Sequence, residues 1–138
     1  MLRAVLSTLL ALIVGSVLIS LVQSLGHVLY PFPGELDLND PEALAKVIAQ
    51  APLGALLMVE LAYVVGCFAA GALVVRLAPG FGLRLPVIVG ALFTVAGFMN
   101  MAAIPHPLWF AVLTTVTYIP MSVLGAKALG EGAGAKNA

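Results

Sequence analysis

The sequence predicts an all-α membrane protein, in which four transmembrane helices form an antiparallel bundle and a short amphipathic helix lies outside the membrane. Two observations predict this class. Of the 138 residues, 62% are hydrophobic and only 9% are charged, whereas about a quarter of a soluble domain is charged. In addition, four apolar stretches nearly free of formal charge are each about 20 residues long or longer, which is enough to cross a bilayer as a helix.

The composition excludes several other classes of protein. A chain this apolar would expose more hydrophobic surface in water than it could bury, which excludes a soluble enzyme and a disordered tail. Six basic and six acidic residues give zero net charge, so no large field attracts nucleic acid. The single cysteine, Cys67, lies in an apolar run and fits a packing residue. We predict no metal, no cofactor and no nucleic-acid partner.

The apolar stretches define a single transmembrane domain over residues 1–129, with spans at about 4–26, 53–76, 85–104 and 107–127. Helices are expected because they satisfy their own backbone hydrogen bonds, as hydrocarbon demands. The first stretch is longer than a signal-peptide core and lacks a clear cleavage site, which favours a retained helix. Residues 130–138 are rich in glycine and alanine and predict a flexible cytoplasmic tail.

Polar residues of the first span recur at helical spacing. Ser16, Ser20, Gln23, Ser24 and His27 fall on one stripe of a helix with 3.6 residues per turn. Small polar residues allow helices to approach closely, so the stripe can be a packing seam. It can equally be the wall of a polar cavity.

The longest loop, over about 28–52, is predicted to lie outside the cell and to contain the amphipathic helix. Prolines 31 and 33 prevent a helix at its start. Asp40 followed by Pro41 is a helix start, with a capping carboxylate and proline at the first helical position. The helix is predicted over about 41–50, with Leu44, Val47 and Ile48 on one face, on the membrane surface or over the mouth of the bundle.

Glu60 is the only acidic residue inside a span. A carboxylate at such a position costs about 2.5–3.5 kcal/mol on insertion scales, so it must be neutral, paired or hydrated. It can carry protons, or it can be a structural group bonded to a neighbouring helix.

Small residues at 62, 66 and 70, and at 90, 94 and 97, predict close helix contacts, either within the chain or between copies.

Polar residues of all four spans fall at similar depths in the outer half of the membrane. Counted from the span centres, Glu60, Asn100, Ser20 and Thr114 lie at about one level, about 7 Å from the middle at 1.5 Å per residue. We expect either an outward-facing polar pocket around Glu60 or a hydrogen-bonded core without a ligand. The candidate pocket residues are Glu60, Asn100, His27, Ser20, Gln23, Tyr63, Thr114 and Tyr118.

Aromatic residues and the two histidines lie near the expected outer ends of the first and last spans. His106, Trp109 and Tyr30 are expected at the membrane interface, where amphipathic rings are enriched. His27 and His106 are the only histidines and could ligate haem or a metal if their helices were adjacent. Pro120 is expected to bend the last helix, as a hinge or as a fixed kink.

The basic residues predict the topology. Arg3, Arg76, Arg84, Lys127 and Lys136 all fall on one side of the membrane if the chain crosses four times, and only Lys46 falls on the other. The positive-inside rule then places both termini in the cytoplasm.

Three strings carry a resemblance to a family: HVLYPFPGELDLNDPEAL, APLGALLMVELAYVVGCFAAG and IPHPLWF, followed by YIPM in the last span. They resemble small four-helix membrane proteins of bacteria, over nearly the whole chain. The resemblance implies a multi-pass protein of the bacterial inner membrane and implies no activity, substrate or catalytic residue.

Three functional hypotheses follow. The first is a non-enzymatic bundle that handles a small molecule or a lipid, such as a small transporter-like homo-oligomer, with Glu60 in its pocket. The second is a binding or accessory subunit of a larger membrane complex, suggested by the acidic outer loop and its amphipathic helix. The third is a haem- or metal-binding enzyme that uses His27 and His106; it ranks last because no acid–base pair occurs at a diagnostic spacing.

Overall fold

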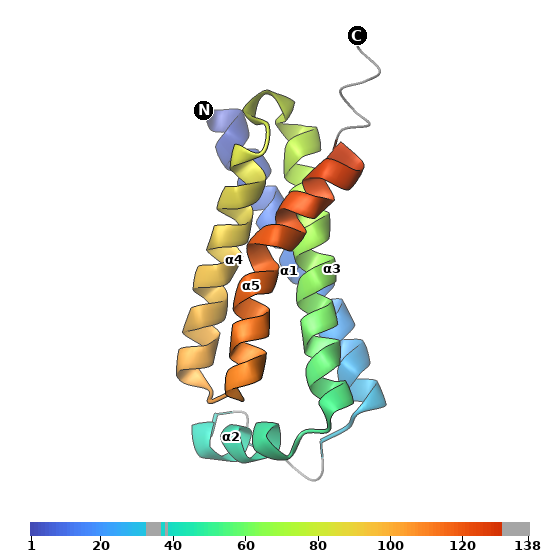
Figure 1. Cartoon of the computed structure of the whole chain (residues 1–138), viewed down its shortest axis with the longest axis vertical. Coiled ribbons are helices and arrows are strands. Elements are labelled where there is room, and N and C mark those ends of the chain that lie inside the picture. Colours follow the sequence, from blue (N-terminus) through green and yellow to red (C-terminus); the bar gives the residue numbers. More distant parts are fainter. Residues whose placement is uncertain (33–36, 38, 131–138) are drawn as a thin grey trace.

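The computed structural model describes residues 1–32, 37 and 39–130, and this part of the chain is almost entirely helical, without strands. Five α-helices follow one another (Figure 1). They are α1 (Leu2–Leu29), α2 (Pro41–Gln50), α3 (Leu53–Leu77), α4 (Arg84–Ala103) and α5 (Leu108–Gly125). A short 3-10 helix, η1 (Pro79–Phe81), precedes α4, and a π-helical turn, η2 (Ala126–Gly130), follows α5.

The four long helices are those predicted from hydropathy, and all four are long and apolar enough to cross a membrane. Their ends differ by a few residues from the predicted ones. The first helix extends from Leu2 to Leu29 instead of 4–26 and stops just before the proline-containing segment. The last helix begins after Pro107 and changes to a π-helical turn at Ala126. The predicted flexible tail at 131–138 lies outside the described residues.

The amphipathic helix α2 begins and ends as predicted. The backbone N–H of Glu42 donates to Oδ1 of Asp40 over 2.9 Å, and Pro41 occupies the first turn, where its missing N–H costs nothing. Leu44, Val47 and Ile48 are half-buried, whereas no residue of α2 is fully buried. In Figure 1, α2 lies across one end of the long helices. This position agrees with one of the two predicted placements, over the mouth of the bundle.

The long helices have two distinct ends (Figure 1). One end, here called the terminal end, holds the N-terminus, the α3–α4 connection and the end of α5. The other, the α2 end, holds α2 and the α4–α5 connection. Arg3 and Arg76 lie at the terminal end, where they donate to the carbonyls of Leu77 (2.7 Å) and Leu129 (2.9 Å). Each arginine thus satisfies a carbonyl that a helix end leaves without an intrahelical partner.

Helix α3 is the centre of the arrangement, because it packs against α1, α5 and α4, whereas α1 and α4 touch each other only slightly. Its small residues serve these contacts. Gly66 lies against Gly15 and Ile19 of α1, and a Cβ on Gly71 would collide with the backbone of Ser122 in α5. Small residues are used in this way between membrane helices. The predicted small-residue stripe of α3 is therefore used for packing within the chain.

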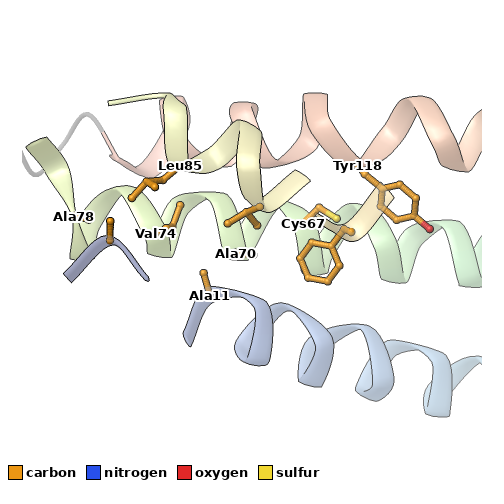
Figure 2. Close-up of a cluster of buried hydrophobic side chains, with 10 residues drawn as sticks. Ala11, Cys67, Ala70, Val74, Ala78, Leu85 and Tyr118 are labelled. Atoms are coloured by element: carbon orange, nitrogen blue, oxygen red, sulfur yellow. The ribbon is translucent and has the colours of Figure 1, made fainter. Parts of the chain in front are cut away.

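The core at the terminal half consists mainly of small side chains. Figure 2 shows Ala11 of α1 facing Ala70 and Val74 of α3, with Leu85 of α4 and Cys67 close by. Cys67 is fully buried there, as expected of a packing residue. Because these side chains are short, the helix backbones approach closely and their buried atoms make many dispersion contacts.

Helix α5 changes direction along its length, and its last part leans across α3 (Figure 1). Pro120 lies in this helix, and proline removes an intrahelical hydrogen bond. Tight contacts with α4 hold the bend just before and just after Pro120. Gly90 of α4 lies against the backbone of Ile119, and the buried Ser122 hydroxyl donates to the Pro86 carbonyl over 2.8 Å. These contacts favour a fixed kink over a hinge.

Candidate functional site

A cavity of about 240 Å³ lies inside the α2 end of the helices. We call it the α2-end cavity. It is bounded by Gln23, Gly26 and His27 of α1, by Met58 and Tyr63 of α3, and by Asn100, Ile104, His106 and Phe110 from α4, α5 and the turn between them. Ile48 of α2 also lines it, as do Tyr30, Phe32 and Ala51 of the segments on either side of α2. Residues from all five α-helices therefore contribute to one space.

Three polar residues of the cavity also border a second space. Gln23, Tyr63 and Asn100 line both the α2-end cavity and a groove of about 300 Å³ between α1 and α4. We call this second space the α1–α4 groove; Ser16, Ser20, Ala96 and Tyr118 also border it. It exists because α1 packs against α3 and leaves its α4 side nearly free. Ser16, Ser20 and Gln23 of the predicted stripe thus border this groove, whereas Ser24 lines neither space and its hydroxyl donates to the Ser20 carbonyl within α1.

The two histidines line the same cavity but differ in their surroundings. His106 is half-buried, stacks on Phe110 with ring centroids 5.6 Å apart, and its Nδ1 lies 2.6 Å from the carbonyl oxygen of Ile104. This contact requires the Nδ1–H tautomer and leaves Nε2 of a neutral ring as an acceptor. His27 is exposed and lies against Phe32, with centroids 5.0 Å apart.

Glu60 is placed differently from the predicted pocket centre. It is only 8% exposed, and its carboxylate faces α5 instead of lining the α2-end cavity. Thr114 donates to Oε2 over 3.0 Å, whereas the Thr117 hydroxyl contacts Oε1 and also lies 2.9 Å from the carbonyl oxygen of Leu113, so its one proton is shared between two acceptors. Both carboxylate oxygens therefore contact a hydroxyl of the neighbouring helix. We call this arrangement the Glu60 clamp; it matches the predicted alternative of a structural group bonded to another helix.

The remaining candidates divide between these places. Ser20 borders the α1–α4 groove, and Thr114 belongs to the Glu60 clamp. Tyr118 is buried between them, with its ring 5.3 Å from that of Tyr63. Tyr30 lines the cavity, with its hydroxyl against Gly54 at the start of α3, while Trp109 is 45% exposed at the start of α5.

Sequence reasoning missed the apolar part of the cavity wall and one member of the Glu60 clamp. Met58 and Phe110 line the cavity, and nothing in an apolar sequence separates such residues from ordinary packing residues. Ile48, which also lines it, lies on the face of α2 that is predicted to cover the membrane surface or the mouth of the bundle. Thr117 could have been found, because it lies three residues after Thr114 and therefore on the same helix face.

The cavity has the chemistry of a binding site. The described residues that line it include no Asp, Glu, Lys or Arg, so its polar groups are amides, phenols and imidazoles, which donate and accept hydrogen bonds without formal charge. Apolar walls with a few polar groups are typical of small-molecule sites. Across residues 1–32, 37 and 39–130, no group of three or more His, Cys, Asp and Glu side chains could hold a metal ion.

Comparison of the chain with known protein families, curated proteins and solved structures finds no match.

Proposed function

We propose that this protein is a non-enzymatic membrane protein that binds a small molecule or a lipid in the α2-end cavity. A single observation carries the proposal: α1, α3, α4 and the turn between α4 and α5 bring Gln23, Tyr63, Asn100 and His106 of an otherwise apolar chain to one cavity. Polar side chains are costly within a membrane and usually mark a ligand or its pathway. Glu60 is not needed for this role, because it is already bonded within the Glu60 clamp.

The proposed setting is the bacterial inner membrane, as in the proteins that the sequence resembles, with the four long helices crossing it as an antiparallel bundle. The positions of the basic residues support the orientation. Arg3, Arg76 and Arg84 belong to the terminal end, and Lys46 lies on α2. With the terminal end cytoplasmic, the α2-end cavity faces the outside of the cell, and α2 lies at the outer surface of the membrane.

The second candidate is an accessory or binding subunit of a larger membrane complex. The observation that favours it is the free face of α1, where Ile13, Val17 and Leu21 are exposed. Such a face can contact lipid or another helix, so partners beyond membrane lipids remain a prediction.

Native mass spectrometry of the full chain released from mild detergent tests the proposal. We expect a reproducible adduct on the wild-type protein. Ala55 lines the cavity, so Ala55→Trp should fill it and remove the adduct. Leu57→Trp is the matched control, because Leu57 is exposed on the same helix and should keep the adduct. A bare wild-type chain, or an adduct that survives Ala55→Trp, would contradict the proposal.

A further inference from the structure

The α2-end cavity and the α1–α4 groove share one wall, here called the partition. The chemistry of this partition indicates which kind of ligand fits. The partition consists of Gln23, Tyr63 and Asn100, which line both spaces. The ring centroids of Tyr63 and Tyr118 lie 5.3 Å apart, and both tyrosines border the groove together with Gln23 and Asn100, so hydrogen-bonding groups are concentrated there. A ligand at this partition would have hydrogen-bonding groups on one side and a path out on the other.

The α1–α4 groove opens sideways. Ser16, Ser20 and Ala96 are exposed although they lie well inside their helices. In a membrane-spanning bundle, residues at such positions face acyl chains. The groove therefore connects the inner wall of the cavity with the lipid phase, whereas α2 covers the cavity on the water side.

The seam between α1 and α4 is divided near its middle. Phe93 of α4 is buried, and its ring tip lies close enough to Gly15 of α1 that a Cβ there would come within 2.9 Å of it. On the terminal-end side of Phe93, the seam forms a separate apolar groove that includes Leu9, Leu12 and Leu92. Phe93 also lines the α1–α4 groove, so a chain that enters from the partition meets this ring and is directed outward between the helices there.

We infer that the ligand is an amphiphile with an uncharged, hydrogen-bonding head, bound at Gln23, Tyr63 and Asn100, and an apolar chain that leaves through the α1–α4 groove. The inference rests on the proposed function and names its ligand class. An uncharged head is favoured because the described lining residues of both spaces include no Asp, Glu, Lys or Arg to neutralise a charge, and the two histidines, His27 and His106, line the α2-end cavity but not the groove. Amides and phenols suit hydroxyl and carbonyl groups, as in a monoacylglycerol or a quinone.

Photolabelling of the full chain in phosphatidylcholine nanodiscs tests this inference. The probe is a monoacylglycerol with a photoreactive group in the first part of its chain, and labelled positions are mapped by mass spectrometry. We expect labels concentrated within residues 16–23 and 96–100. Ser20→Trp should reduce this labelling about tenfold, equivalent to about 1.4 kcal/mol of binding free energy. Leu21 is the exposed residue next to Ser20 and does not line the groove, so Leu21→Trp should leave the labelling unchanged.

Two charged probes with the same apolar chain test whether the head group of the ligand is uncharged. A fatty acid and an alkyltrimethylammonium should each label the groove much less than the monoacylglycerol does. Equal or stronger labelling by either would overturn the assignment of an uncharged head. Labels spread evenly over the exposed faces and unaffected by Ser20→Trp would overturn the groove as the chain's path.

Two further outcomes separate this inference from the proposed function. The first outcome is that the monoacylglycerol probe does not label the groove, while native mass spectrometry still shows an adduct that Ala55→Trp removes. The cavity then binds a ligand of another class, and only the inference about the amphiphile is wrong. If Ser20→Cys forms a disulfide between two chains in the membrane, with Cys67 replaced by alanine, a second copy covers the groove and the amphiphile is excluded from it.

Discussion

The Glu60 clamp gives the sharpest quantitative prediction. The hydroxyls of Thr114 and Thr117 of α5 both contact the carboxylate of Glu60 on α3, and Thr114 is 2% exposed. Thr114→Val keeps the shape of the side chain and removes its donor. The loss leaves one carboxylate oxygen without that hydroxyl, so we expect the variant to lower the free energy of unfolding by about 1–2 kcal/mol. The range lies above the average of about 0.6 kcal/mol for interhelical hydrogen bonds in membranes, which reach about 1.7 kcal/mol, because the acceptor here is a carboxylate and hydrogen bonds to charged groups are stronger.

Thr115 provides a matched control. Its hydroxyl donates to the Ala111 carbonyl in its own helix over 2.7 Å, so Thr115→Val removes a hydroxyl from the same turn without affecting Glu60. A double-mutant cycle with Glu60→Ala, measured by steric trapping in bicelles, should give a coupling of about 1 kcal/mol or more for Thr114. For Thr115 the coupling should lie within about 0.3 kcal/mol of zero. Equal couplings, or none for Thr114, would refute the clamp.

Other perturbations test the packing, the cap and the topology. Gly71→Leu should destabilise the protein by at least ~1–3 kcal/mol, because its side chain would collide with the Ser122 backbone, whereas Gly80→Leu, in open space, should change the unfolding free energy little. Asp40→Ala should weaken α2 by about 0.5–2 kcal/mol through loss of its N-cap, seen as faster amide exchange confined to α2. With Cys67 replaced by alanine, a cysteine at Lys46 should react with a membrane-impermeant thiol reagent added outside intact cells; protection there would reverse the proposed orientation.

The four long helices and α2 were predictable because each has a local cause. Residues 53–76 form an almost uncharged run, and that property alone demands a helix in lipid. Asp40 and Pro41 fix the start of α2 through their own backbone chemistry. Such signals lie within a few consecutive residues, so no knowledge of the neighbouring helices is needed.

The direction in which Glu60 points was not predictable, because it depends on which helices are neighbours. Counting residues gives the depth of a side chain, and at that depth Glu60, Asn100 and Thr114 look equivalent. Helices that are apolar on every side give no period from which an inner face can be read. The structure separates these residues: Thr114 bonds to Glu60, whereas Asn100 lines the cavity and the groove.

The polar stripe of α1 shows the same limit. Its spacing placed Ser20 and Gln23 on one face, as the structure has them, bordering the α1–α4 groove. Whether that face would meet another helix or leave a space depends on α1 packing almost entirely against α3. This preference comes from close contacts such as Gly66 with Gly15, which a single sequence does not pair.

A crystal structure of the wild-type chain grown from a lipid mesophase would test the central claim most directly. The account predicts density for a bound molecule in the α2-end cavity, within hydrogen-bonding distance of Gln23, Tyr63 or Asn100, with the Glu60 carboxylate still bonded to Thr114. A cavity filled by the chain's own side chains, or by a helix of a second copy, would contradict the claim that this end of the protein is a ligand site.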